Sequence, residues 1–308
     1  MSNAIRIRMG GYGPPSTGFS KSLKLIGDKL GAQFGSDVTI DYVFNIMDHG
    51  HKAEDILTLV ENGEITLGYQ SSSYLTDRVP ELGFVDLPFL FSSNAQARAA
   101  MDGALGEFLA RKTEERINYR ILGWFENGFR HISNRLRPIH RPADMAGMKI
   151  RVLPSEIHRR TFDLLGAVAM RMDLTEAIGM IKAGTLDAQE NPLANTVTYG
   201  VHKLHKFHTL SNHFYISRPI FLHRPSFESW PDGLKRAMQS AVSEAVAYKR
   251  KLAVEEHEES YRAIEAAGCE INALTPNELE LFVAAIQPLL ADARKTYGDA
   301  MFKMVPQP

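Results

Sequence analysis

One stretch near the carboxyl end of the chain limits the possible folds more than any other. From Pro231 to about Gly268, apolar residues recur at helical spacing, and no glycine or proline interrupts the stretch after Gly233. About 35 helical residues would span roughly 50 Å at about 1.5 Å per residue, which exceeds the width of one small lobe. The stretch therefore predicts a single long helix that bridges two lobes.

Strand and helix patterns alternate along the rest of the chain. Strand patterns occupy residues 5–9, 38–44, 65–69, 149–153 and 185–190, and amphipathic helical patterns lie between them. Strands that alternate with short helices are typical of parallel sheets. The alternation therefore predicts an α/β fold with a mainly parallel sheet in each lobe.

The closing segment of the chain predicts one further helix. Residues 275–298 begin with Thr275 as the N-cap and Pro276 in the first position, and Glu278 completes a capping box. Pro288 lies inside the same pattern and should kink the helix, because proline cannot donate the backbone hydrogen bond.

Composition places the chain among ordinary globular proteins. Its 308 residues suit two lobes, and 44% apolar with 23% charged residues exclude disorder and fibrous repeats. A net charge of -1 gives no argument for a nucleic-acid or membrane-surface partner. The charge is unevenly spread, however. Residues 130–160 hold seven arginines and one lysine against two carboxylates, which favours an anion in that region.

Cysteine content and apolar runs narrow the cellular setting. The single cysteine, Cys269, excludes an internal disulfide and a multi-cysteine metal site. No run of 18 apolar residues predicts a transmembrane helix. The opening MSNAIRIRMGG lacks the apolar core of a signal peptide, which fits a cytosolic protein or a mature form whose leader was removed.

Motifs for catalysis and cofactor binding are missing from the sequence. There is no GxSxG elbow, no GxGxxG after a strand and no GxxxxGK[ST] loop. The segment HKLHKFH places His202, His205 and His208 three apart, but interleaved lysines and the lack of a local carboxylate favour a solvated face over a zinc site. The sequence therefore predicts no metal, no cofactor and no catalytic residue.

Polar residues at the ends of predicted strands are the remaining candidates for a site. In KIRV, Lys149 and Arg151 share one strand face, so periodicity leaves Arg151 either solvated or aimed into a pocket. Ligands of open α/β sheets bind outside the carboxyl ends of strands. Two arginines can hold one carboxylate through their paired planar donors. The candidates of this kind are Gln70, Ser71, Arg130, Arg151, Glu190 and Asn191.

Four stretches resemble the solute-binding proteins of tripartite ATP-independent periplasmic (TRAP) transporters, the DctP-type family. The first is DLPFLFSSNAQARAAMDG at residues 86–103, and the second is residues 128–152, which end in MKIRV. The third is residues 166–192, which end in QENP, and the fourth is TLSNHFYISRP at residues 209–219. Their order and spacing agree with the family over nearly the full length.

The resemblance implies a two-lobed type II periplasmic-binding-protein-like fold of the α/β class, with the long helix bridging both lobes. Residues 1–125 with about 213–250 would form lobe 1, and residues 126–212 with about 251–308 would form lobe 2. The ligand would bind in the cleft between the lobes. The family implies a periplasmic protein that captures a small organic acid and delivers it to TRAP membrane permease subunits. We expect a monomer and no nucleic-acid partner.

The resemblance also assigns site residues. The family typically fixes the ligand carboxylate with the arginine of KIRV, here Arg151, and the matching positions for supporting contacts are Arg130 and Asn191. His213 falls where the family often has a histidine in a polar network. Further candidates for contacts with the rest of the ligand are Gln70, Tyr215, Tyr12 and Met170. Aromatic and sulfur side chains would suit a partly apolar or aromatic acid as readily as a sugar acid.

Two alternatives remain open for the function. An enzyme on the same fold would need a general base in the cleft, where Glu190 is the only carboxylate that the sequence places. A ligand-sensing domain would have a partner other than a permease. We expect a binding protein and not an enzyme.

Overall fold

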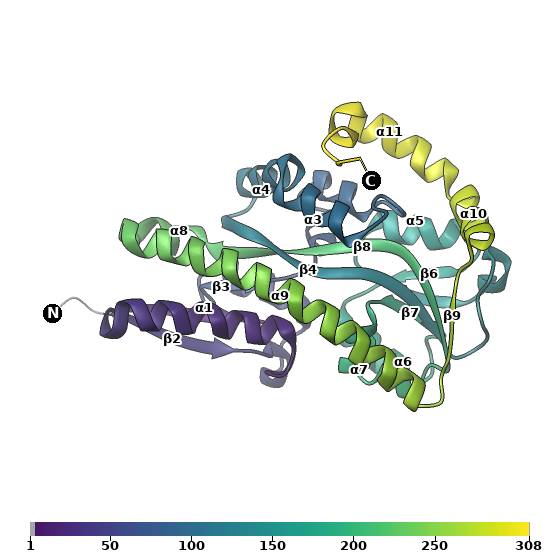
Figure 1. Ribbon diagram of the computed structural model, residues 1–308, viewed down its shortest axis with the longest axis horizontal. Helices are drawn as coiled ribbons and strands as arrows, with labels where there is room; N and C mark the ends of the chain where they lie inside the picture. The colour runs from purple at the N-terminus through teal and green to yellow at the C-terminus, as the bar shows by residue number, and fades with distance from the viewer. Residues whose placement is uncertain (1–3, 308) are drawn as a thin grey trace. The chain divides into compact units, whose positions relative to one another are not determined.

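The computed structural model (Figure 1) describes residues 4–307. The chain divides into two compact units. Unit 1 takes the chain up to Ser72 together with Gly106–Glu126 and Ser217–Val254, and unit 2 takes Ser73–Leu105, Asn127–Ile216 and the chain from Glu255 onward. Three long elements contribute residues to both units: β4 (Tyr119–Asn134), β8 (Phe207–His223) and α9 (Asp232–Ala266). The first three residues of the opening segment lie outside the described residues.

Unit 1 is built around a short parallel sheet. Strand β1 (Ile5–Gly10) pairs in parallel with β2 (Val38–Val43) and with β3 (Leu67–Tyr69), and β3 pairs antiparallel with β8. Helix α1 (Gly18–Phe34) packs against β2 (Figure 1) and buries Phe19, Leu23, Ile26 and Leu30. The other helices that contribute to unit 1 are α2 (Ile56–Glu61), α4 (Ala104–Arg116) and α8 (Arg224–Ser229).

Unit 2 has β5 (Lys149–Val152) between two parallel neighbours, β6 (Val168–Arg171) and β7 (Ala188–Asn191). β7 pairs antiparallel with β4, and β9 (Glu270–Ala273) pairs in parallel with β8. The core of this unit gathers around Phe162, Phe214 and Phe282. Its helices are α3 (Asn94–Asp102), α5 (Glu156–Leu164), α6 (Leu174–Lys182), α7 (Leu193–Thr198), α10 (Pro276–Ala285) and α11 (Gln287–Phe302).

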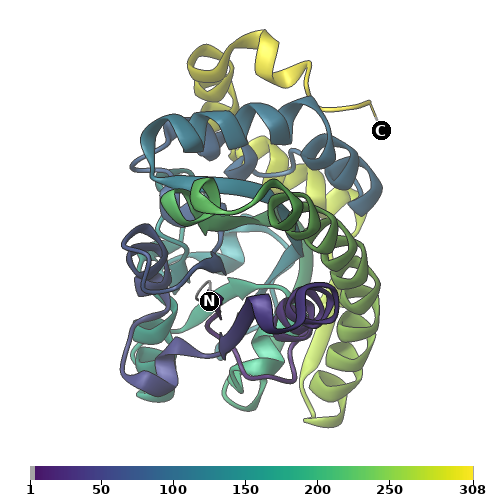
Figure 2. The ribbon, with the colours of Figure 1, turned by 90° about the vertical axis from the view of Figure 1, so that its left-hand side faces the viewer.

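The long helix predicted from the sequence is confirmed. α9 has 35 residues and appears as one unbroken coil in both views (Figures 1 and 2). It ends at Ala266, ahead of Gly268, whose φ of 74° is a left-handed conformation that glycine adopts without a steric cost. Within residues 4–307, no helix combines the length and the apolar character that a membrane span requires.

The segment of residues 73–105 belongs to unit 2, whereas the sequence interpretation placed it in lobe 1. The Phe89 amide donates to the His213 carbonyl at 2.9 Å, and Arg151 Nη2 donates to the Tyr74 hydroxyl at 3.1 Å. These contacts join residues that are far apart in the sequence. The local alternation of strands and helices could therefore not predict these contacts.

The closing segment forms two helices rather than one kinked helix. α10 ends at Ala285 and α11 begins at Gln287, with Ile286 between them. The break occurs just before Pro288, which is consistent with the backbone donor that proline lacks. The capping box predicted at Thr275 and Glu278 is confirmed, because each side chain accepts from the other residue's backbone amide.

The prediction that HKLHKFH forms a solvated face is wrong. Strand β8 begins at Phe207, so no helix aligns the three histidines, and His205 and His208 are each only 1% exposed. His205 Nδ1 lies 3.0 Å from Ser133 Oγ, and His208 Nε2 lies 3.0 Å from the His205 carbonyl oxygen. Burial lowers the pKa of His205 to about 3 and that of His208 to about 4, so both rings are neutral at neutral pH.

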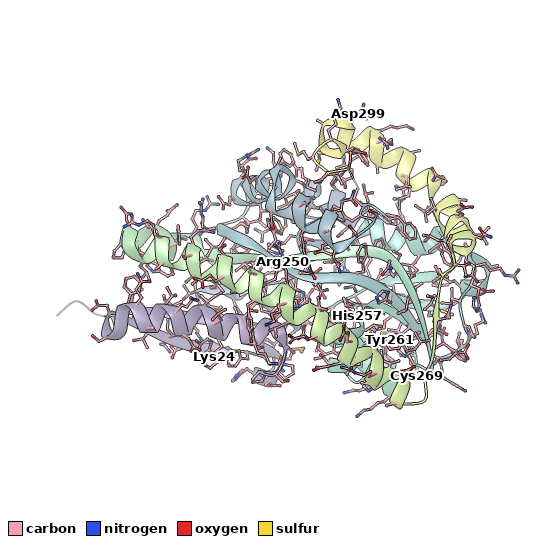
Figure 3. All side chains as sticks on the ribbon, in the orientation of Figure 1. Lys24, Arg250, His257, Tyr261, Cys269 and Asp299 are labelled. Carbon is pink, nitrogen blue, oxygen red and sulfur yellow. The ribbon has the colours of Figure 1, made fainter. Side chains whose placement is uncertain are left out.

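Cys269 contributes to the same buried region. It lies just beyond α9 (Figure 3), and its thiol donates to the carbonyl oxygens of His202 at 3.2 Å and His205 at 3.5 Å. The thiol therefore has a structural position.

Substitution of the core residue Phe162 by alanine should destabilise the protein by about 3–5 kcal/mol, because the side chain is fully buried and leaves a cavity. The matched control is Leu164→Ala on the same helix, which is 37% exposed and should change the free energy of unfolding by about 0.5 kcal/mol. Urea unfolding followed by circular dichroism measures both values. Equal losses in the two variants would contradict the position assigned to α5.

Acid should destabilise the protein below about pH 6.5, the ordinary histidine pKa. Burial lowers the pKa of His131, His158 and His205 to about 3 and that of His208 to about 4. The unfolded chain therefore binds more protons than the folded chain as the pH falls toward 4. Each such proton lowers the free energy of unfolding by about 1.4 kcal/mol for each unit that the pH falls. Asp86, whose pKa burial raises to about 7, acts in the opposite sense and cancels about one of these protons.

The measurement is urea unfolding at several pH values. His205→Gln should flatten the acid slope by about 1.4 kcal/mol per pH unit, and His49→Gln, at an exposed position, should leave it unchanged. A slope that His205→Gln does not alter would show that this ring is not buried in its neutral form.

Candidate functional site

Strand β5 carries Arg151 into the interior of unit 2. Arg151 lies opposite Met170 of β6 and Gln189 of β7 in the two parallel registers. It is 1% exposed, whereas Lys149, two residues earlier on the same strand face, is exposed. Lys149 is the first residue of the strand, and Arg151 lies further along it, where a second strand pairs on each side. The structure therefore places Arg151 inside the unit and not in solvent.

The guanidinium of Arg151 is held by neutral groups. Nε and Nη2 each donate to the Met172 carbonyl oxygen at 3.1 Å, and Nη2 also donates to the Tyr74 hydroxyl at 3.1 Å. Among residues 4–307, Arg151 has no ion pair, and its Nη1 makes no hydrogen bond. Arg151 is therefore a buried cation without a direct ion pair among residues 4–307, and the Tyr74 hydroxyl that it contacts donates to the Asp173 carboxylate at 3.3 Å.

Arg130 is the opposite case, because its charge is already matched within unit 2. Its Nε donates to Glu190 Oε2 and its Nη2 donates to Glu190 Oε1 at 2.9 Å, and both side chains are at most 1% exposed. Burial alone would raise the pKa of Glu190, but Arg130 and His213 together lower it far below the ordinary value. The ion pair occupies two of the three nitrogens that Arg130 could offer to a ligand. The structure therefore gives Arg130 a resident carboxylate that the sequence did not predict.

His213 extends this ion pair into a polar network. Its Nε2 lies 3.5 Å from Glu190 Oε2, and its Nδ1 lies 2.7 Å from Ser211 Oγ. Burial lowers the pKa of His213, and the nearby Glu190 carboxylate opposes that shift. The network therefore joins the Arg130–Glu190 pair to a buried histidine.

His158 shows that the two arginines lie in one region. Its ring stacks on Phe214 with centroids 3.9 Å apart, and it is fully buried. Burial lowers the pKa of His158 to about 3, and the positive charges of Arg130 and Arg151 both contribute to this shift. Both arginines are therefore near one neutral ring, and the surplus positive charge of the group comes from Arg151.

The remaining candidates of unit 2 are placed beside these groups. Asn191 Nδ2 donates to Gln189 Oε1 at 3.2 Å, and its oxygen accepts from Asn195 Nδ2 at 3.1 Å, so the amide is oriented by a chain of neighbours. Tyr215 is buried with its ring edge-on to Phe129, with centroids 5.3 Å apart. Met170 is half-buried on β6, opposite Arg151.

Two of the predicted residues lie in unit 1. Gln70 Nε2 donates to the Ala53 carbonyl at 2.8 Å and its oxygen accepts from the Ser71 amide at 2.8 Å, so both ends of this amide are used inside the unit. Tyr12 is buried, with its ring centroid 5.4 Å from that of Tyr69. Neither residue joins the group around Arg151 within unit 2.

Two residues of interest were missed by the sequence interpretation. Tyr74 orients Arg151, and no local pattern marks it, because the contact spans 77 positions. Arg218 is buried in unit 1. The sequence could have indicated its burial, because Arg218 is a charged residue in the otherwise mostly apolar last part of β8.

The site offers little for acid–base catalysis or metal binding. The low pKa of Glu190 and its pairing with Arg130 make this carboxylate a poor general base. Within the described part of the chain, no three His, Cys, Asp or Glu side chains are arranged to hold a metal ion.

Comparison with known proteins places the chain in a family. The profile of bacterial extracellular solute-binding protein family 7, DctP, matches residues 43–296. A solute-binding protein of Verminephrobacter eiseniae is 29% identical over 246 residues, which cover 80% of this chain and 72% of that protein.

Solved structures agree with the fold. A TRAP periplasmic solute-binding protein from Polaromonas, bound to D-erythronate, superposes with a TM-score of 0.91 at 24% identity and covers 97% of each chain. A second, from Sulfurospirillum deleyianum with bound succinate, has a TM-score of 0.91 at 25% identity and covers 99% of each chain. The two-lobed α/β fold and the resemblance to TRAP solute-binding proteins are thus confirmed. The chain belongs to the DctP family, the bacterial extracellular solute-binding proteins of family 7.

Proposed function

We propose that this protein is the periplasmic receptor of a TRAP transporter, and that it captures a small organic acid through its carboxylate. Arg151 provides the principal contact, and Arg130 and Asn191 support it. The protein delivers the ligand as a monomer to membrane permease subunits. The chain acts by binding and not by catalysis.

The observation that carries this proposal is the uncompensated charge of Arg151. A cation that is 1% exposed and lacks a carboxylate partner among residues 4–307 carries a large desolvation cost. A ligand carboxylate would supply the missing charge and accept from Nη1, which is the nitrogen that the protein leaves unused. Arg130 also has no hydrogen bond from Nη1 to residues 4–307, so it can add a second donor without breaking its ion pair.

The structural relatives support a carboxylate as the common chemistry. Erythronate is a sugar acid and succinate is a dicarboxylate, and the proteins that hold them share the fold of this chain. The half-buried Met170 and the aromatic pair of Tyr215 and Phe129 support a partly apolar ligand.

A thermal-shift screen against small organic acids tests the proposal. A ligand at 100 times its Kd should stabilise the folded protein by about 2.7 kcal/mol and raise Tm accordingly. The matched neutral alcohol or amide of the same acid should have no effect, because it cannot compensate Arg151. The proposal fails if no acid raises Tm, or if the neutral analogue raises it equally.

Arg151→Met should weaken binding of the identified acid by at least about 100-fold, or about 2.7 kcal/mol, because the ligand carboxylate loses its counter-charge. Isothermal titration calorimetry measures the change. Lys149→Met is the matched control, since Lys149 is exposed on the same strand face and should alter Kd by less than about twofold. An unchanged affinity in Arg151→Met would remove this residue from the site.

Arg130→Met should lower the free energy of unfolding by about 3–5 kcal/mol, because it leaves the Glu190 carboxylate buried and unpaired. Arg151→Met should leave the unliganded protein about as stable as before, because removal of a buried charge without an ion pair offsets the loss of its hydrogen bonds to Met172 and Tyr74. Urea unfolding of both variants measures the difference. The double variant Arg130→Met with Glu190→Met should recover stability, and a failure to recover would contradict the pairing.

A further inference from the structure

Unit 2 contains a buried carboxyl group that the proposed carboxylate site does not use. Asp86 belongs to the DLPFLF segment and is fully buried. Its Oδ1 accepts a hydrogen bond from Ser73 Oγ at 2.6 Å, and its Oδ2 has no hydrogen-bond partner among residues 4–307. No lysine or arginine of the same range forms an ion pair with it. Asp86 is therefore a buried carboxyl group with one unsatisfied oxygen and no cationic partner.

His158 lies beside Asp86 and is also fully buried. Its Nε2 is 3.6 Å from Asp86 Oδ1, just beyond hydrogen-bond distance, and neither ring nitrogen has a hydrogen-bond partner among residues 4–307. Burial lowers the pKa of His158 to about 3, so the ring is neutral and gives Asp86 no counter-charge. A proton on Asp86 would remove the buried negative charge and supply a donor for the ring nitrogen.

The surroundings of Asp86 suit a group that gains and loses a proton near neutral pH. Burial raises the pKa of Asp86 to about 7, although the hydroxyl groups of Ser73 and Ser155 favour the charged form. A carboxyl group with this pKa is about half protonated at pH 7. A change of charge nearby therefore changes how much of the protein carries this proton.

Titratable and charged side chains face the pair of Asp86 and His158 from β4, β5, β7, β8 and α11. They are Arg130, Arg151, Glu190, His213 and Tyr297. Glu190 favours a proton on each member of the pair and Arg130 disfavours it, so the charges of this ion pair oppose each other. Burial lowers the pKa of His213 and raises that of Tyr297, which opposes the charged form of each. Arg151 disfavours a proton on His158 and is the one arginine of the set without an ion pair among residues 4–307.

A cavity of about 250 Å³ in unit 2 gives protons a route to this pair. Ser155 and Tyr297 line the cavity, and both interact with the Asp86 carboxyl group. Asp77, whose side chain is 75% exposed, lines it as well, so the cavity opens to solvent. The Ser155 hydroxyl can pass a proton between the cavity and Asp86, because a hydroxyl group both donates and accepts.

We propose that Asp86 is a proton-binding site coupled to the anion site, and that it takes up a proton when a carboxylate binds to Arg151. The proposal rests on the function proposed above. A bound carboxylate neutralises Arg151 and adds a negative charge to the region, and both changes favour a proton on Asp86. The coupling is reciprocal, so protonation of Asp86 strengthens binding of the acid. Affinity therefore rises as the pH falls through the range in which Asp86 titrates.

Calorimetry in two buffers tests the proposal. The probe is the acid with the largest effect in the thermal-shift screen, which begins with succinate and D-erythronate. Phosphate and Tris differ in ionisation enthalpy, so the difference in binding heat between them gives the number of protons taken up. We expect uptake of about 0.4–0.5 proton at pH 7 and at most about 0.1 at pH 6, where Asp86 is already mostly protonated. Kd should weaken by about 5- to 10-fold between pH 6 and pH 8.

Asp86→Asn removes the titratable group and keeps its size and an oxygen that can accept from Ser73. It should reduce the uptake at pH 7 to near zero and hold Kd within about twofold between pH 6 and pH 8. Asp77→Asn is the matched control, because Asp77 is an exposed carboxylate of the same segment. It should keep the proton uptake and the pH dependence of the wild-type protein.

Infrared difference spectroscopy of the wild-type protein covers the case in which Asp86→Asn does not fold. Binding of the same acid at pH 7 should increase the carbonyl band of a protonated carboxylic acid. Labelling of the aspartate carboxyl groups with ¹³C should shift this band, because the proton is on an aspartate. A band that labelling does not move, or no increase at all, would overturn the proposal.

The outcomes separate the two proposals. A failure of every acid in the screen to bind would overturn both. Binding without proton uptake, or uptake that Asp86→Asn leaves unchanged, would overturn the role of Asp86 and leave the proposed function standing. Equal loss of uptake in Asp86→Asn and Asp77→Asn would also overturn it, because the effect would then be one of overall charge.

Discussion

The buried ion pair between Arg130 and Glu190 is the interaction on which the interior of unit 2 depends. It joins β4 to β7, it keeps Glu190 ionised despite complete burial, and it places a negative charge next to His213. Because the charges of Arg130 and Glu190 balance each other, the remaining positive charge of the region belongs to Arg151. The contrast between an arginine with an ion pair and an arginine without one, both near His158, is the basis of the carboxylate site that we propose.

Such a site works at the expense of stability. A buried cation without a counter-charge destabilises the unliganded protein, and a ligand carboxylate removes that destabilisation when it binds. Fixed neutral donors and acceptors, the Met172 carbonyl and the Tyr74 hydroxyl, hold Arg151 in one orientation in the meantime. Little side-chain entropy is then lost on binding, which favours affinity for a small ligand.

Much of the local structure could be predicted from the sequence. The strands at Ile5–Gly10 and Lys149–Val152, the N-cap at Thr275 and the 35-residue helix α9 all follow from short-range rules of periodicity and capping. Two of the differences between the sequence prediction and the structure have a common cause. The burial of His205 and the transfer of residues 73–105 to unit 2 both depend on contacts between residues far apart in the chain, to which no local pattern is sensitive.

The sequence by itself determined the α/β class, the long helix, the family motifs and the arginine of KIRV as the residue to examine first. Tertiary structure decided which charges are matched. Arg130 and Arg151 look alike in the sequence, as do Lys149 and Arg151 on their strand face. Only the pairing of β7 with β4 brings Glu190 to Arg130, and Arg151 is left without an ion pair among residues 4–307. The physical reason is that the energy of a buried charge depends on neighbours within a few ångströms in space, whatever their separation along the chain.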